Sequence, residues 1–102
     1  MIELGPGDGS LAKILLKSFK KFPEFNSIKN MFLLEKSIFL RSVQKKKILN
    51  NDVKWIDNLN VIKKGPVVFF GNEFFDAIPV KQFSQNNKKI LEKCYMVNNQ
   101  GL

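Results

Sequence analysis

The sequence predicts an α/β fold, in which helices flank a parallel β-sheet and a β-hairpin follows toward the C-terminus. Short apolar runs of strand length alternate with stretches of helical periodicity, a pattern typical of βαβ units with parallel strands. A glycine-rich turn joins the first apolar run to the first helical stretch. Acidic residues follow the apolar runs, at the sheet edge where ligands bind in folds of this type.

The first strand–helix unit occupies the N-terminal residues. Residues 1–4 are mostly apolar and predict the end of a strand, and residues 5–9 predict a glycine turn. Ser10 is predicted to cap a helix that runs to about residue 22, because Pro23 cannot continue it. A helical period places four apolar residues on one face of this helix: Leu11, Leu15, Phe19 and Phe22.

The second unit repeats this order. Residues 31–34 form a compact apolar run that predicts a buried parallel strand. Ser37 is predicted to cap a second helix through about residue 49. The apolar positions expected to pack along this helix are Phe39, Val43, and Ile48 or Leu49.

Four further strands are predicted in the rest of the chain. Residues 53–56 and 67–70 are short apolar runs that complete the parallel set. Gly65-Pro66 interrupts the chain between them. Residues 80–84 and 90–97 predict the two strands of a hairpin around a turn at residues 85–89.

Composition excludes several classes of site. The chain has 102 residues and no histidine, which removes serine–histidine triads, histidine-ligated zinc and a histidine general base. No metal site is predicted. Its one cysteine, Cys94, leaves no intrachain disulfide and fits a reducing compartment. No apolar run reaches the length of a membrane span.

Acidic residues are placed unevenly along this basic chain, whose net charge is +8. Six of them lie at or just past the ends of the four predicted parallel strands: Glu3, Asp8, Glu35, Asp57, Glu73 and Asp76. Carboxylates accept hydrogen bonds from ammonium and hydroxyl groups. We therefore expect an acidic rim that suits a cationic nucleoside with a sulfonium, an ammonium and two ribose hydroxyls better than it suits a pyrophosphate.

The glycine turn reads Glu3-Leu4-Gly5-Pro6-Gly7-Asp8-Gly9. Glycines let the backbone turn sharply and let a ligand approach without obstruction from Cβ atoms. The dinucleotide fingerprint requires Gly or Ala where this chain has Ser10, so the turn instead has the form found in class I methyltransferases. Glu35 ends the second strand, where an acid that binds ribose belongs. This acid supports a nucleoside site without selecting the cofactor, since enzymes that use NAD have it too.

Four segments in order resemble the MidA-like methyltransferases, the family of the mitochondrial complex I assembly factor that methylates a protein arginine. They are Glu3-Leu4-Gly5-Pro6-Gly7-x-Gly9, Glu35-x-Ser37-x-x-Leu40-Arg41-x-x-Gln44, Trp55-x-Asp57-x-Leu59, and Gly65-Pro66 followed by residues 72–83. The resemblance covers positions 2 to about 84. It implies a Rossmann-like class I methyltransferase fold and S-adenosyl-L-methionine as the cofactor.

The resemblance also implies roles for individual residues. Those expected to bind the cofactor are Glu3 at the methionine ammonium, Gly5, Gly7 and Gly9 through backbone access, Glu35 at the ribose and Asp57 at the adenine amino group. Trp55 or Ile56 would cover the adenine ring unless the tryptophan packs in the core. Asn72, Glu73 and Asp76 are expected where the acceptor arrives, as catalytic residues. The implied acceptor is a protein arginine, with a respiratory complex I subunit as the candidate partner.

Two alternatives remain open. The glycine turn also occurs in rRNA adenine dimethyltransferases, and the charge of +8 favours an RNA acceptor. Those enzymes, however, have Asn-Leu-Pro-Tyr or a close variant where this chain has Asn72-Glu73-Phe74-Phe75. The other alternative is a non-catalytic binding module with an open strand edge. It follows from the expectation that residues 1–102 are a partial cofactor-binding domain, with its first strand incomplete and later strands missing. The oligomeric state is not predicted.

Overall fold

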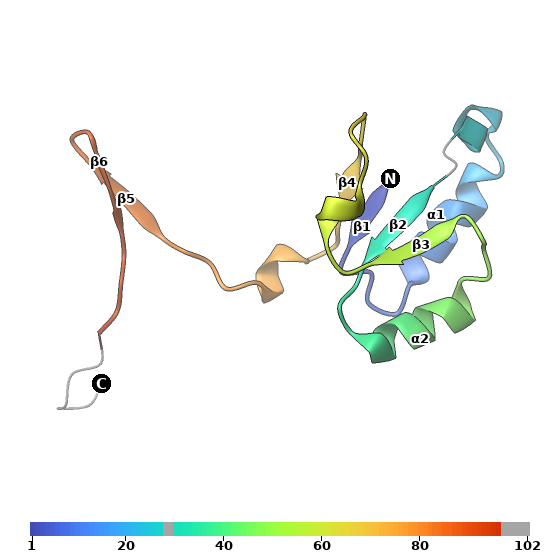
Figure 1. Cartoon of the computed structure of the whole chain (residues 1–102), viewed down its shortest axis with the longest axis horizontal. Helices are drawn as coiled ribbons and strands as arrows, with labels where there is room; N and C mark the ends of the chain where they lie inside the picture. Colours follow the sequence, from blue (N-terminus) through green and yellow to red (C-terminus); the bar gives the residue numbers. More distant parts are fainter. Residues whose placement is uncertain (28–29, 97–102) are drawn as a thin grey trace.

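The computed structural model describes residues 1–27 and 30–96 and confirms the predicted α/β fold (Figure 1). Two α-helices and four strands form its body, joined by short 3-10 helices. The strands are β1 (Ile2–Leu4), β2 (Met31–Leu34), β3 (Val53–Ile56), β4 (Phe69–Phe70), β5 (Phe83–Asn86) and β6 (Lys89–Glu92). The helices are α1 (Ser10–Phe19) and α2 (Ile38–Lys47), and the 3-10 helices are η1 (Pro23–Ser27), η2 (Leu59–Val61) and η3 (Phe75–Ala77).

The first four strands form one parallel sheet in the order β3-β2-β1-β4. The chain builds outward from β1 through β2 to β3 and then returns to the other side of β1 for β4. The direction of winding therefore reverses between β1 and β4. In open parallel sheets such a reversal creates a crevice at the carboxyl ends of the strands, where ligands bind.

The start of α1 corrects one prediction. Gly9, in the left-handed region at φ 81°, is the N-cap, and Ser10 is the first helical residue. The side chain of Ser10 donates instead to Asp8 Oδ2 at 2.9 Å. The helix ends at Phe19, short of the predicted residue 22, because the chain tightens into turns before Pro23.

The packed face of α1 also differs from the predicted one. Ala12 is fully buried, and Leu15 and Leu16 pack against the core beside it. Leu11 and Phe22, both assigned to the apolar face, are 36% and 52% exposed. The small Ala12 lets the helix lie close to the sheet, which turns Leu11 away from it.

The cap of α2 agrees with the prediction, since Ser37 Oγ accepts a hydrogen bond from the Leu40 N–H at 3.2 Å. The helix ends at Lys47, and Ile48 is buried just after it. Of the two alternatives predicted at the end of this helix, Ile48 is the packed residue and Leu49 is exposed, whereas Phe39, which was expected to pack, is exposed. The buried residue within α2 is a polar one, Gln44. Its hydrogen bonds, described below, explain why an amide occupies this position.

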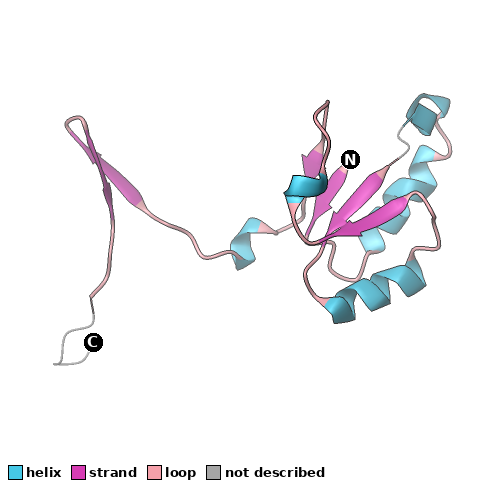
Figure 2. Ribbon diagram, in the orientation of Figure 1, coloured by secondary structure: helices cyan, strands magenta, loops and turns pink. Residues whose placement is uncertain are grey.

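Both α-helices lie on one face of the sheet (Figure 2), where α1 and Ile48, just after α2, contribute to the core. The buried members of this core are Ala12, Met31, Leu33, Ile48 and Val53. Leu15, Leu16, Trp55 and Phe70 pack against it from its margin. Strand register explains the arrangement, because neighbouring residues in adjacent parallel strands, such as Leu33 and Trp55, point to the same face.

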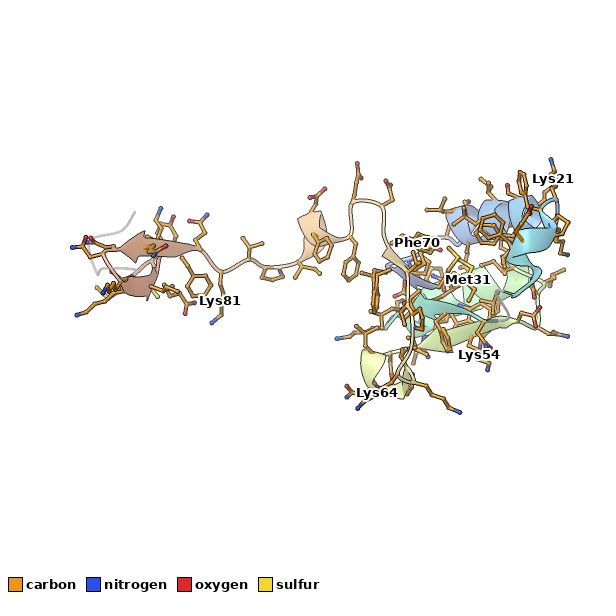
Figure 3. The ribbon with its side chains drawn as sticks, turned by 90° about the horizontal axis from the view of Figure 1, so that it is seen from above. Lys21, Met31, Lys54, Lys64, Phe70 and Lys81 are labelled. Carbon is orange, nitrogen blue, oxygen red and sulfur yellow. The ribbon has the colours of Figure 1, made fainter. Side chains whose placement is uncertain are left out.

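The predicted hairpin is present, with shorter strands. β5 and β6 pair in antiparallel register over residues 83–86 and 89–92, around a turn at Asn87 and Lys88. Residue 97, the predicted end of the second strand, lies outside the described residues. The hairpin lies far from the sheet, so that Lys81 is distant from Met31 and Phe70 (Figures 1 and 3). All eight strand residues are exposed, so here no core packing extends the pairing.

Candidate functional site

The carboxyl ends of four parallel strands bring the predicted site segments to one edge of the sheet. The glycine loop, residues 5–9, follows β1, and residues 71–76 follow β4 on the other side of the switch point. Glu35 and Asp57 follow β2 and β3, and the Glu35 N–H donates to the Ile56 carbonyl at 3.0 Å. The fold thus brings together segments that are far apart in the sequence, and the predicted acidic rim depends on such a grouping.

Glu3 lies inside β1, with only 3% of its surface exposed. Strand register places it on the same face as Leu33 and Phe70, its neighbours in β2 and β4. Burial between these apolar residues raises the pKa of Glu3 to about 7. Among the buried side chains that the structure describes, its Oε2 is the only oxygen or nitrogen atom without a hydrogen-bond partner. An unpaired buried carboxylate oxygen is costly, and it is suited to accept a hydrogen bond from a cationic ligand.

The glycines of the loop differ in what surrounds them. All three adopt positive φ angles, 61° at Gly5, 55° at Gly7 and 81° at Gly9. A Cβ atom on Gly7 would meet nothing within 4 Å, so this part of the loop is open to a ligand. A Cβ atom on Gly9 would lie 2.9 Å from Ile48 Cδ1. Gly9 is therefore required by the packing of α2 against the loop.

Gly5 connects the loop to the segment after β4. A Cβ atom on Gly5 would lie 2.6 Å from Cδ2 of Phe74. Gly71 approaches from the same segment, since a Cβ atom there would lie 3.0 Å from the Leu4 carbonyl oxygen. These close approaches hold the residues predicted to meet the acceptor beside those predicted to meet the cofactor.

Asp8 belongs to the predicted acidic rim, but its carboxylate is paired with other groups of the protein. Its carboxylate forms an ion pair with Lys47 of α2 and accepts hydrogen bonds from the Ser10 N–H and hydroxyl, each at 2.9 Å. These contacts, with Lys47 first, lower the pKa of Asp8 to about 2. The rim is thus less uniform than the sequence implied, because the charge of Asp8 is balanced by Lys47 and Glu3 is buried.

Glu35 is oriented by the start of α2. Its Oε1 accepts from the Ser37 N–H at 2.8 Å, and its Oε2 lies 3.4 Å from Gln44 Nε2. Each carboxylate oxygen can accept a further hydrogen bond, which leaves capacity for two hydroxyl donors. Asp57 stands next to Glu35 in the edge and accepts a hydrogen bond from Asn58 Nδ2 at 2.7 Å.

The predicted catalytic residues follow β4 in an exposed segment. Asn72 and Glu73 precede η3, and Asp76 lies within it. Glu73 adopts a left-handed backbone at φ 53°, a conformation that side chains rarely occupy. Strain of this kind often marks functional segments, and it supports the location without assigning a role.

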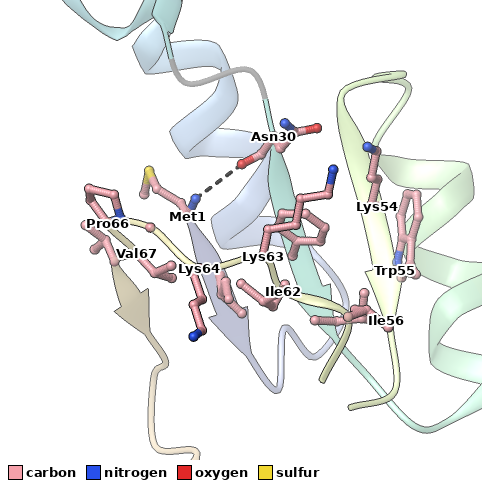
Figure 4. A pocket seen from close by; sticks show the side chains of 15 residues that line it. Met1, Asn30, Lys54, Trp55, Ile56, Ile62, Lys63, Lys64, Pro66 and Val67 are labelled. Atoms are coloured by element: carbon pink, nitrogen blue, oxygen red, sulfur yellow. Dashed lines mark hydrogen bonds between the residues drawn. The ribbon is translucent and has the colours of Figure 1, made fainter. Parts of the chain in front are cut away.

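A cavity lies elsewhere in the described part of the chain. It has a volume of about 1240 Å³ and lies on the face opposite the core, between the sheet and residues 61–68 (Figure 4). Met1, Asn30 and Pro66 line it near the amino ends of the strands. Trp55 and Ile56, one of which was predicted to cover the adenine ring, line it, but none of the predicted acids, loop glycines or acceptor residues does. We favour the carboxyl edge, because ligands of parallel sheets bind there and because the cavity brings together no acid.

Sequence reasoning gave Gln44 no role, although it belongs to one of the matching segments. The structure makes it the link between the glycine loop, Glu35 and Trp55. No other feature of the sequence marked it, because its three partners come from distant segments. Trp55 itself packs against the core, in agreement with the core alternative for this residue.

Within residues 1–27 and 30–96, no group of three acids or cysteines is arranged to hold a metal ion. No helix in the described part of the chain is long and apolar enough to cross a bilayer.

Comparison with known proteins relates the chain to a protein family and to a curated relative. Residues 1–101 match a protein family described as "putative S-adenosyl-L-methionine-dependent methyltransferase". The chain is also 27% identical, over 106 aligned positions, to a Caenorhabditis elegans protein named as a mitochondrial homologue of the protein arginine methyltransferase NDUFAF7. That alignment covers 84% of this chain and 24% of the relative, so the chain spans about a quarter of the relative's length.

Proposed function

The chain belongs to the family of S-adenosyl-L-methionine-dependent methyltransferases, and from this premise we propose that its glycine loop and strand-end acids bind S-adenosyl-L-methionine for methylation of a protein arginine. The observation that carries the proposal is the convergence of the Gly5–Gly9 loop and Glu35 at one sheet edge, with the unpaired Oε2 of Glu3 at the base of the loop. We further propose that residues 1–102 form the cofactor-binding part of the domain.

The residues at this edge fit the groups of the cofactor. In the proposal Glu3 accepts a hydrogen bond from the methionine ammonium, which would supply the partner that its Oε2 lacks. Gly5, Gly7 and Gly9 form the turn, and the open side of Gly7 lets the cofactor approach the backbone. Glu35 holds the ribose hydroxyls through its remaining acceptor capacity. Asp57 accepts a hydrogen bond from the adenine amino group.

When bound, S-adenosyl-L-methionine supplies a methyl group activated by the positive sulfur. The part of the protein would be to hold the guanidinium nitrogen in line with that methyl group and to take up the one proton that the nitrogen would lose. Glu73 and Asp76 supply carboxylates that orient the guanidinium and receive that proton, and Asn72 adds an amide to the same segment. The protein thus contributes positioning and electrostatics, which are the main requirements of an in-line displacement.

An arginine acceptor is supported by the name of the Caenorhabditis elegans relative, a protein arginine methyltransferase homologue. We propose that the acceptor protein is a respiratory complex I subunit. The activity would take place in the mitochondrial matrix of a eukaryote or in the cytoplasm of a bacterium. RNA is the second candidate acceptor, favoured by the net charge of +8. Phosphate contacts would give RNA binding a steep salt dependence, which protein methylation does not require.

The test is calorimetric titration of the 102-residue chain with S-adenosyl-L-methionine. We expect binding by the wild-type chain and affinity at least about tenfold weaker in Glu35→Ala, because hydrogen bonds to a charged group are lost. Asp52 is an exposed acid just before β3, at the amino ends of the strands, and Asp52→Ala is the control that should bind like wild type. Equal affinity in Glu35→Ala and wild type would remove Glu35 from the site. Absence of wild-type binding would refute the proposal.

A further inference from the structure

Gln44 is fully buried in α2, and its amide joins three parts of the sheet edge. Its Nε2 donates to the Gly7 carbonyl at 2.7 Å and lies 3.4 Å from Glu35 Oε2. Its Oε1 accepts from the indole N–H of Trp55 at 2.8 Å. One side chain therefore contacts the loop after β1, the acid after β2 and the tryptophan of β3.

The partners fix the orientation of this amide. The Trp55 indole nitrogen only donates, so the amide oxygen must face it. The Gly7 carbonyl only accepts, so the amide nitrogen must face the loop. No other neutral side chain of this length offers two donors on one atom and an acceptor on the other. The position thus requires glutamine for a chemical reason, in addition to its volume.

The same helix secures the loop at neighbouring positions. Lys47, one turn after Gln44, binds Asp8 and donates to Ser10 Oγ at 2.7 Å. Ile48 and Gln44 also fill the space where Gly9 would carry a side chain. Among these contacts the Gln44 bond is the one that reaches Gly7, whose outer side is open.

We propose that Gln44 is the positioning residue of the cofactor site. It holds the Gly7 carbonyl toward α2 and fixes the Glu35 carboxylate, so that the loop and the ribose acid are preorganised together. It does not touch the cofactor. The indole of Trp55, bonded to the same amide, reports on this arrangement. The inference rests on the proposed function for its cofactor, and its effect on the loop can be measured without one.

The first measurement is amide hydrogen exchange of the cofactor-free chain. The Gly9 N–H donates to the Pro6 carbonyl at 2.8 Å and reports on the loop. The Phe32 N–H donates to the Met1 carbonyl at 2.9 Å and reports on the sheet. In Gln44→Met, which removes every polar contact at similar volume, we expect Gly9 exchange to accelerate at least about tenfold while Phe32 exchange changes less. A purely structural role would accelerate both sites equally, since general loss of stability opens the whole fold.

The second measurement combines calorimetry with the fluorescence of Trp55, the only tryptophan in the chain. With S-adenosylhomocysteine as the probe, Gln44→Met should bind at least about tenfold more weakly and show altered emission. Gln44→Glu keeps an acceptor for the indole and loses the amide donor, so its emission should stay close to that of wild type while binding weakens. It also serves as the second variant if Gln44→Met does not fold. Lys46→Ala, exposed on α2, is the control and should change neither property.

These outcomes separate the two proposals. If wild type binds the probe and the Gln44 variants bind equally well with Gly9 exchange unchanged, the role of Gln44 is refuted and the proposed function stands. If wild type does not bind, the proposed function fails, and the contrast between Gly9 and Phe32 exchange still decides whether Gln44 positions the loop. Equal acceleration at both amides overturns the inference in either case.

Discussion

Replacing Glu3 by glutamine should remove a pH dependence of folding that the buried carboxyl imposes. Glu3 lies between Leu33 and Phe70, and this burial raises its pKa from 4.5 to about 7. Between these two pH values the unfolded chain releases the proton while the folded chain retains it. The stability contributed by the protonated carboxyl is therefore complete below about pH 4.5 and is lost as the pH rises toward 7.

The magnitude follows from the two pKa values. Each pH unit between them corresponds to about 1.4 kcal/mol, so the full interval amounts to about 3 kcal/mol of unfolding free energy. Glutamine is nearly the same size and stays neutral. The free energy of unfolding of Glu3→Gln, relative to wild type, should therefore rise by up to about 3 kcal/mol between pH 4.5 and pH 8.

Urea unfolding followed by Trp55 fluorescence measures this difference at several pH values. Asp52→Asn changes an exposed acid outside the core and should give a profile parallel to that of wild type. Parallel profiles for Glu3→Gln and wild type would contradict the burial argument. They would mean that the carboxyl is solvated or paired in solution, and the unpaired Oε2 would no longer point to a ligand.

Two further predictions concern the glycine loop. Asp8→Asn should be less stable than wild type at neutral pH and equal to it near pH 2. The lowered pKa of Asp8 stabilises the fold at pH values above the ordinary pKa of an aspartate, and this contribution is lost as the pH falls toward 2. Acid unfolding curves of the two proteins should therefore converge near pH 2, and a constant difference would contradict the ion pair. In Gly5→Ala the free energy of unfolding should fall by more than about 2 kcal/mol, because of the positive φ and the contact with Phe74. In Gly7→Ala, where the surrounding space is open, it should fall by only about 1–2 kcal/mol, and cofactor binding should weaken instead. Thermal unfolding and calorimetry measure both effects, and equal stability losses at the two glycines would refute the close approach of Phe74.

Most of the sheet could be predicted from the sequence, because its strands are short apolar runs between polar stretches. The bounds of β2 and β3 agree with the predicted residues 31–34 and 53–56. β4 is shorter than the predicted 67–70, since only Phe69 and Phe70 pair with β1. The parallel direction of the strands was predicted from the intervening helices. The structure adds the strand order, in which β4 lies beside β1 and places the residues after it next to the glycine loop.

The errors arose where tertiary contacts override local patterns. Ser10 is a good cap residue, but Gly9 can adopt the left-handed backbone that packing against Ile48 requires, so Gly9 is the cap and the helix begins one residue earlier than predicted. Glu3 reads as a rim acid in sequence, and only the flanking strands β2 and β4 bury it. Gln44 looked like an ordinary helix residue because its three partners come from distant segments. The roles of the cofactor and acceptor residues stay predictions.

The central claim is that the cofactor binds at the carboxyl edge of the sheet. Mapping amide chemical-shift changes on addition of S-adenosylhomocysteine tests it most directly. We predict that the largest changes fall on the glycine loop, Glu35 and Asp57, with little change at the cavity-lining residues Lys63 and Val67. Changes concentrated around that cavity, with the glycine loop unaffected, would contradict the account.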